Sequence, residues 1–458
     1  MNSVVEQLTQ VLGCAQVHSG DLLTGRATSF WNGEPTQARA IIYPRTTAEV
    51  SQTLATCQAN NQPVVVQGGL TGCVAGAVSQ KQDIILSLEK MTAIESIDAI
   101  GSTATLQSGV ILEILQNTLA DHGLMFPLDL GARGSCTIGG NIATNAGGIN
   151  VLRYGMMRDL VLGIEAVLAD GTVISSMNKM IKNNAGYDLK QLFIGSEGTL
   201  GVVTRAVVKL FPLPNSVNCA LVAVKDFNDV SKLLSTVRTQ LAGNLSAFEV
   251  MWGDYYRAVT DAGGHRPPLP REYPFYVVIE TEGSDVEGDS KRFNATLEQL
   301  FNDDVIIDAV IPKSESERHL VWQIREDFEA ILEQKPYYLY DVSLPIRDMP
   351  RYVAEVNKGL AAAFNKGQCY VLGHVADGNL HLFICPGQPG DSHEACNALV
   401  YEPLRAFQGS VSAEHGIGTE KMAWLNVSRN EAEIALMRQL KGLLDPTGIL
   451  NPNRVVKG

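Results

Sequence analysis

The chain has 458 residues, and its 36 Lys and Arg against 49 Asp and Glu give a formal net charge of -13. Nucleic acid is excluded as a main partner because phosphate binding needs a basic surface. Apolar residues make up 45% and charged residues 19%, a globular composition that excludes an intrinsically disordered chain. At roughly 150 residues per domain, the length predicts two or three domains.

No apolar run reaches the roughly 18 residues that a membrane-spanning helix requires, so we expect no integral membrane segment. The N-terminus carries Glu6 and no basic residue before Arg26, which is typical neither of a secretory signal nor of a transit peptide. We therefore expect a cytoplasmic protein, with peripheral attachment to a membrane as the alternative. Eight scattered cysteines without a CxxC pair predict free thiols.

Short strands dominate the predicted first half of the chain, with one early helix at 47–60. The strand-like segments, in chain order, are IIYP, PVVVQ, DIILSL, ATLQSG, LVLGIEAVLADGTVI and GVVTRAVVKLFPL. Pro212 and Pro214 close this part, so we expect a first domain over 1–214.

Strands that alternate with helices predict a ferredoxin-like α+β domain over 215–425. A helical pattern from Glu431 to Leu444 ends at Asp445-Pro446. We expect residues 426–458 to form a C-terminal helical segment that packs back on the first domain.

Glycines gather at 68–76 and again at 131–148. Such clusters indicate backbone that takes positive φ or approaches a ligand closely, with tight turns as the alternative. The first cluster follows PVVVQ, an arrangement that points backbone N–H groups at phosphate oxygens. It lacks GxGxxG, so a Rossmann site is not supported. The second cluster carries neutral hydrogen-bonding side chains that suit a long cofactor.

The segment VLGHVADGNLHLFI has two apolar alternating runs around Asp377-Gly378, a dipeptide typical of a two-residue type I′ hairpin turn. Such a turn would place His374 opposite His381, with Cβ atoms about 5 Å apart, from which both imidazoles can reach one metal ion. Glu414, in SAEHGIG, would complete a two-His, one-carboxylate metal site. The alternatives are two core histidines and a capping carboxylate.

Several long motifs are similar to those of a known family. VVVQGGLTG, GSCTIGGNIATNAGGINVLRYG and GSEGTLGVVT resemble segments of the vanillyl-alcohol-oxidase-type flavoproteins, which have a PCMH-type FAD-binding domain. GHVADGNLH, SAEHGIG and DPTGILNP resemble their D-2-hydroxy-acid dehydrogenase branch. The resemblance runs from about Arg39 to Arg454. It implies that an α+β substrate domain and a C-terminal helical segment follow the FAD domain.

The resemblance also implies an FAD cofactor, with its pyrophosphate on 67–72 and its flavin near 134–148 and 201–203. Some relatives attach the flavin to a histidine in or near the first loop. Residues 64–76 contain no histidine, so we expect non-covalent FAD. The residues assigned to the cofactor are Gln67, Gly68, Gly69, Leu70, Thr71, Gly72, Gly134, Ser135, Ile138, Gly139, Asn141, Thr144, Asn145, Gly148, Gly201, Val203 and Asn451.

For the substrate site, the resemblance implies a divalent metal, zinc or manganese, with three ligands: His374, His381 and Glu414. It assigns the role of general base to His415. It assigns the substrate carboxylate to Arg325, in WQIRED, because a guanidinium can bind a carboxylate through two hydrogen bonds. An ion pair with Glu326 or Glu329 on the helix surface is the alternative for Arg325.

The implied reaction is oxidation of a D-2-hydroxy acid by hydride transfer to FAD. A metal on the substrate oxygens would lower the hydroxyl pKa, so that a neutral imidazole can act as base. The sequence contains no nicotinamide motif, so an electron-transfer flavoprotein, a quinone or a cytochrome is the expected acceptor. The oligomeric state is left open, although a homodimer is common among relatives.

Three positions bear on the choice of substrate. D-2-hydroxyglutarate enzymes of this branch carry Thr, Lys and Asn where this chain has Glu329, Leu339 and Phe383. A second substrate carboxylate would then be desolvated without a partner, so we expect D-lactate or an apolar D-2-hydroxy acid to be preferred. Three alternatives are a D-2-hydroxyglutarate dehydrogenase, a sugar- or alcohol-oxidising flavoprotein and a non-catalytic flavin-binding subunit of a glycolate-oxidase-like complex. The histidine and glutamate set argues against the last two.

Overall fold

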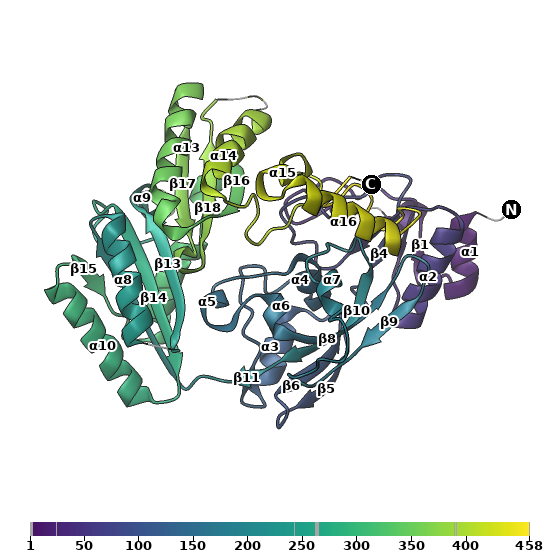
Figure 1. Cartoon of the computed structure of the whole chain (residues 1–458), viewed down its shortest axis with the longest axis horizontal. Coiled ribbons are helices and arrows are strands. Elements are labelled where there is room, and N and C mark those ends of the chain that lie inside the picture. The colour runs from purple at the N-terminus through teal and green to yellow at the C-terminus, as the bar shows by residue number, and fades with distance from the viewer. Residues whose placement is uncertain are drawn as a thin grey trace. The chain divides into compact units, whose positions relative to one another are not determined.

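The computed structural model describes residues 3–23, 25–241, 243–261, 265–388, 390 and 392–457. They form two compact units (Figure 1). Unit 1 consists of Met1–Gly148, Gly155–Leu213 and Glu414–Gly458, and unit 2 of Ile149–Tyr154 and Pro214–Ala413. This division differs from the predicted boundaries, because residues 149–154 cluster with unit 2 and residues 414–425 with unit 1. Both units contain helices and β-sheets, which confirms the predicted α+β class.

Unit 1 begins with a four-stranded sheet of order β1-β2-β4-β3. Its strands are β1 (Val17–His18), β2 (Ala40–Ile42), β3 (Val64–Gln67) and β4 (Ile84–Ser87), and its helices are α1 (Val4–Leu12) and α2 (Thr47–Ala59). Strands β2 and β3 both run parallel to β4. Helix α2 begins where predicted, because the Thr46 side chain accepts a hydrogen bond from the Glu49 N–H and so caps the helix.

The second sheet of unit 1 has five antiparallel strands in the order β5-β6-β10-β8-β9. They are β5 (Ile94–Asp98), β6 (Thr103–Gln107), β8 (Val161–Val167), β9 (Val173–Ser176) and β10 (Val202–Lys209). The shorter elements are α3 (Leu112–Ala120), α4 (Ile138–Thr144), α6 (Met157–Leu160) and α7 (Lys190–Phe193), with β7 (Leu124–Met125) paired to β11 (Phe211–Pro212). Strand β8 is buried along its whole length, which places the core of this unit against it.

The C-terminal segment completes unit 1. Helix α16 (Glu431–Leu444) has the predicted bounds, and Asn430 and Glu433 form a capping box at its start. After the helix, Leu450 forms a parallel bridge with Val64 of β3. Buried Asn451 accepts from the Val66 N–H at 2.8 Å. These contacts fix the C-terminal segment to the strand that leads into the first glycine cluster.

Unit 2 is built on a seven-stranded antiparallel sheet of order β15-β12-β14-β13-β17-β18-β16. The strands are β12 (Ser216–Val224), β13 (Leu245–Trp252), β14 (Phe275–Gly283), β15 (Asp308–Val310), β16 (Tyr338–Ser343), β17 (Gln368–Gly373) and β18 (Asn379–Cys385). The helices are α5 (Val151–Tyr154), α8 (Phe227–Gln240), α9 (Gly253–Asp261), α10 (Val286–Asn302), α11 (Glu315–Glu326), α12 (Glu329–Leu332), α13 (Met349–Ala363) and α14 (His393–Phe407).

The first four strands of unit 2, with α8 and α10, have the order of a ferredoxin-like fold. Figure 1 shows α8 and α10 beside β14 and β15, and α13 and α14 beside β16 to β18. A core on the sheet includes Tyr255 and Tyr256 of α9 and Trp322 of α11. The sheet therefore extends from the ferredoxin-like strands to the hairpin β17–β18, which carries the histidines.

No helix among the described residues combines the length and the apolar character that a bilayer crossing demands. The eight cysteines are free thiols, as predicted, and six of them are buried.

Candidate active site

The two glycine clusters pack against each other within unit 1. A Cβ atom on Gly68 would lie 2.6 Å from Thr137 Oγ1, and one on Gly69 would lie 2.1 Å from the Ser135 carbonyl oxygen. Of the two reasons predicted for the cluster, positive φ does not apply to these two glycines, and the left-handed residues of the loop are Leu70 and Ala75, with φ of 59° and 54°. Glycine is required here because two backbones meet without room for a side chain.

Two other glycines border open space. A Cβ atom on Gly72 or Gly131 would meet no atom within 4 Å. A backbone without side chains, next to open space, allows an extended cofactor to approach it closely. The two clusters therefore fit FAD: Gly68 and Gly69 hold the loops together, while Gly72 and Gly131 leave room beside them.

Several polar side chains predicted to contact the cofactor are engaged within the protein. Gln67 donates to the Ala77 carbonyl at 2.9 Å, and Thr144 donates to the Gly140 carbonyl at 3.1 Å. The others are Asn141, which donates to Cys136 Sγ, Asn145, which accepts from the Arg158 N–H, and Asn451, which donates to the Glu197 carbonyl. These side chains hold the loops in shape, and their contact with FAD stays a prediction.

The remaining predicted cofactor residues include three packing glycines. A Cβ atom on Gly139, Gly148 or Gly201 would come within 2.6 Å of Ser108, Asp129 or Phe193. Of these only Gly148, with φ of 140°, has positive φ. Other predicted residues are Ile138 at the start of α4, Val203 in β10, Thr71 in the first loop and Gly134, whose Cβ would lie 3.3 Å from Glu113 Oε2.

Two single substitutions distinguish a glycine needed for loop packing from a glycine that contacts the cofactor. Gly69→Ala should lower the melting temperature and the FAD content together, because the backbone of Ser135 must move. Gly72→Ala should leave the melting temperature of the flavin-free protein unchanged but reduce its FAD affinity, because its methyl group enters open space. Thermal melts and flavin content measure both. Full FAD affinity in Gly72→Ala would show that the cofactor does not lie there.

In unit 2, one face of helix α11 presents a row of cationic and donor side chains to the sheet. Arg318, Trp322 and Arg325 share this face because they are four and three residues apart. Glu280 of β14 accepts from Arg318 Nε at 2.6 Å and from Trp322 Nε1 at 2.8 Å. Glu249 of β13 accepts from Arg325 Nε at 2.8 Å. Two buried carboxylates therefore anchor this helix to adjacent strands.

Glu249 also binds a histidine. Its second carboxylate oxygen lies 2.6 Å from His374 Nδ1, and its side chain is 1% exposed. Burial alone would raise the pKa of Glu249, but His374 and Arg325 hold it below its usual range. The alternative of a surface ion pair between Arg325 and Glu326 or Glu329 is wrong, because Arg325 is 8% exposed and pairs with Glu249.

The histidine hairpin differs from the predicted two-residue turn. His381 faces Leu372 rather than His374, because β17 ends at Gly373 and a 3-10 turn at Val375–Asp377 follows. His374 therefore lies outside the strand, at the start of this turn. The two imidazoles still meet, with ring centroids 5.4 Å apart and planes at 82°. The wider turn brings together two rings that are not paired across the strands.

A second carboxylate, Asp341 of β16, lies directly across from His381. It is fully buried, and its Oδ1 atom lies 3.8 Å from His381 Nδ1. Asp341 accepts from Asn379 Nδ2 at 2.7 Å and from the Ala413 N–H at 3.0 Å. This last bond fixes the residue that immediately precedes Glu414 in the chain.

Side-chain atoms that could bind a metal lie close together around His381. Within unit 2, the ring centroids of His374 and His381 lie 5.4 Å apart, and the Asp341 carboxylate lies 3.8 Å from His381 Nδ1. Two imidazoles and one carboxylate suit zinc or manganese. Asp341 already accepts two hydrogen bonds from N–H groups, which favours the predicted Glu414 over Asp341 as the carboxylate ligand of a divalent metal.

Glu197, in GSEGTLGVVT, fixes the segment after His415 within unit 1. Its carboxylate accepts from the N–H groups of Ile417 and Gly418 at 2.7 and 2.8 Å. A Cβ atom on Gly416 would lie 2.7 Å from the same carboxylate. Burial raises the pKa of Glu197, while these N–H groups act in the opposite direction.

An apolar wall continues the sheet face that carries His381. Phe383 and Leu339 face each other across β18 and β16, two pairs further along from His381 and Asp341 and therefore on the same face of the sheet. The Phe383 ring lies 5.2 Å from that of Phe328 and is 2% exposed. Phe383 is therefore a core residue as well as a neighbour of His381.

Sequence reasoning missed three carboxylates, Glu249, Asp341 and Glu280, and also missed Glu197. The first three were detectable, because each is the single charge in an apolar stretch of a strand: SAFEVM, YLYDVS and FYVVIE. Burial of an unpaired carboxylate is costly, so such a residue predicts a cationic or donating partner. No comparable signal identifies Glu197, which lies between glycines.

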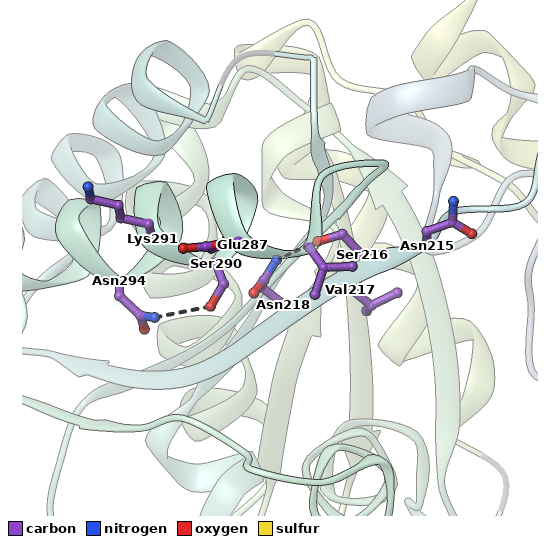
Figure 2. A pocket seen from close by; sticks show the side chains of 9 residues that line it. Asn215, Ser216, Val217, Asn218, Glu287, Ser290, Lys291 and Asn294 are labelled. Carbon is purple, nitrogen blue, oxygen red and sulfur yellow. Dashed lines mark hydrogen bonds between the residues drawn. The ribbon is translucent and has the colours of Figure 1, made fainter.

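A hollow of about 520 Å³ lies between the start of β12 and helix α10. Figure 2 shows its polar lining, in which Asn218 donates to Ser216 and Asn294 to Ser290. Its lining holds one carboxylate, from Glu287, one amine, from Lys291, and no imidazole or thiol. This hollow therefore offers no donor set comparable with the histidine cluster.

Comparison with known proteins found two family models, which match successive parts of the chain. The model for FAD linked oxidases, C-terminal domain, matches residues 213–455, and that for an FAD binding domain matches residues 38–176. The bovine D-2-hydroxyglutarate dehydrogenase (Bos taurus) is 41% identical over 92% of this chain and 77% of its own length.

A Schizosaccharomyces pombe protein, named provisionally as a mitochondrial D-lactate dehydrogenase, is also 41% identical, over 90% of this chain and 81% of its own length. The structure of p-cresol methylhydroxylase shares the fold, with a TM-score of 0.76, 16% identity and coverage of 98% of this chain and 96% of that one. With both domain models matched in order and two relatives at 41% identity, this chain belongs to the FAD-dependent D-2-hydroxy-acid dehydrogenases, a branch of the FAD-linked oxidases.

Proposed function

We propose that this enzyme oxidises a D-2-hydroxy acid to the 2-oxo acid with non-covalent FAD and one divalent metal ion. The observation that carries the proposal is the meeting of the His374 and His381 imidazoles, with ring centroids 5.4 Å apart, each beside a buried carboxylate. Glu414 is the proposed third ligand. When bound, FAD would supply the hydride acceptor, and a metal held by His374, His381 and Glu414 would supply a Lewis acid that lowers the pKa of the substrate hydroxyl group.

The protein's own groups hold the substrate and remove its proton. His415 follows Glu414 in the chain and is the proposed base, since a neutral imidazole accepts a proton near neutral pH. Arg325 is the proposed carboxylate ligand. Its Nε atom is bound to Glu249 and its NH2 group lies 3.5 Å from His374 Nε2, so NH1 is the group proposed to meet a substrate carboxylate.

An apolar side chain on the substrate is favoured by Leu339, Phe383 and Phe328, which form an apolar wall on the face of His381. Glu329 is exposed, so the expected placement of its charge near the substrate is not supported. We therefore propose D-lactate or a larger apolar D-2-hydroxy acid. The bovine relative supports D-2-hydroxyglutarate as the second candidate.

Electrons from the flavin are proposed to pass to an electron-transfer flavoprotein, a quinone or a cytochrome. A cytoplasmic location stays a prediction, because both relatives described above are named as mitochondrial proteins.

Removal of the metal should show that the metal and FAD bind to different residues. Chelation should abolish turnover while the flavin stays bound, because the proposed metal ligands and the glycine loops are different residues. Metal content by mass spectrometry should be one ion per chain, and added Zn²⁺ or Mn²⁺ should restore turnover. A metal-free preparation with full activity would mean that the two histidines are structural.

The substrate is tested by anaerobic flavin bleaching with D- and L-2-hydroxy acids. The D isomers should bleach the flavin, and kcat/KM should be higher for D-lactate, D-2-hydroxyisocaproate or D-mandelate than for D-2-hydroxyglutarate. The physical reason is the cost of leaving a second carboxylate without a partner against Leu339 and Phe383. A clear preference for D-2-hydroxyglutarate would show that another basic residue binds that carboxylate.

A further inference from the structure

We propose that Glu249 is a positioning residue that orients His374 and Arg325 together, an inference that rests on the function proposed above. Glu249 lies in the middle of β13 and is 1% exposed. One of its carboxylate oxygens binds His374 Nδ1 at 2.6 Å, and the other binds Arg325 Nε at 2.8 Å. A single buried carboxylate is therefore shared by a proposed metal ligand and the proposed substrate ligand.

His374 needs such support because the strand does not hold it. It lies beyond the end of β17, at the start of the 3-10 turn. A carboxylate acceptor requires the proton on Nδ1, which leaves the lone pair of the imidazole on Nε2. Glu249 thus selects both the ring orientation and the nitrogen that faces a metal.

Arg325 completes the arrangement by balancing the charge. The guanidinium offsets the negative charge of Glu249, which a buried carboxylate needs. Arg325 NH2 lies 3.5 Å from His374 Nε2, which places the cationic group beside the proposed ligand atom. The buried Tyr255 hydroxyl donates to the Arg325 carbonyl at 3.0 Å and fixes the end of α11.

Glu280 provides a matched control. It lies on the adjacent strand β14, is 4% exposed and binds the same helix through Arg318 and Trp322. The two groups that it binds on α11, Arg318 and Trp322, are separate from the pair His374 and Arg325 that Glu249 binds. Loss of either carboxylate should therefore loosen α11, but only loss of Glu249 should disturb the histidine.

The experiment compares Glu249→Gln and Glu280→Gln in the full-length, FAD-containing, metal-free protein. Titrations with Mn²⁺ and with Zn²⁺ give the metal affinity, and thermal melts give the stability. Both variants should melt at lower temperature. Metal affinity should fall about 10–100-fold in Glu249→Gln, the usual effect of losing a partner of a histidine ligand, and should stay near that of the wild type in Glu280→Gln.

Equal losses of metal affinity in both variants, or unchanged affinity in Glu249→Gln, would overturn this inference alone. A wild-type protein that binds neither ion would overturn the metal site of the proposed function and the inference with it. If Glu249→Gln does not fold, Glu249→Asp replaces it. The shorter aspartate keeps the charge but cannot hold both partners, so it should also weaken metal binding, and wild-type affinity in it would contradict the proposal.

Discussion

The candidate site depends on the need of a buried carboxylate for partners. Glu249, Glu280 and Asp341 each interrupt an apolar strand of the same sheet, and each is almost fully buried. A buried charge without compensation costs several kcal/mol, so each must meet a cation or hydrogen-bond donors. Glu280 meets them on helix α11, Glu249 on that helix and on His374, and Asp341 on Asn379 and the Ala413 N–H.

In the proposed function, these carboxylates orient the histidine rings before a metal or a substrate binds. Glu249 and Asp341 lie beside different imidazoles, at 2.6 Å from His374 and 3.8 Å from His381. Carboxylates behind metal-ligating histidines fix the rings and increase their basicity. Asp341 also fixes the backbone just before Glu414, so the same group acts on the histidine strand and on the residue that precedes the proposed carboxylate ligand.

Much of the fold could be predicted because local patterns determine it. The helix at 47–60 and the helix at 431–444 were found from their periodicity and their end signals, and both form within a residue of the expected bounds. The hairpin turn was wrong because Asp377-Gly378 was given a two-residue turn, whereas a wider 3-10 turn shifts the register by two residues. Only the surrounding structure, including Glu249, brings His374 back to His381.

The glycine loops show a second limit of sequence reasoning. Clustered glycines correctly marked a special backbone, but Gly69 is required by close packing on Ser135, and positive φ occurs at Leu70 instead. Composition cannot distinguish these reasons, because both favour a residue without a side chain. Likewise, the partner of Arg325 could not be predicted, since Glu249 lies on a strand far from it in sequence.

The central claim is that buried carboxylates hold two imidazoles ready for one metal ion. The most direct test is anomalous X-ray scattering at the zinc edge from crystals of the full-length protein equilibrated with Zn²⁺. The account predicts one strong peak about 2.0–2.1 Å from Nε2 of His374 and from a ring nitrogen of His381, with Glu414 as the third ligand and Nδ1 of His374 still on Glu249. A peak bonded to Nδ1 of His374, or no peak between the two histidines, would contradict it.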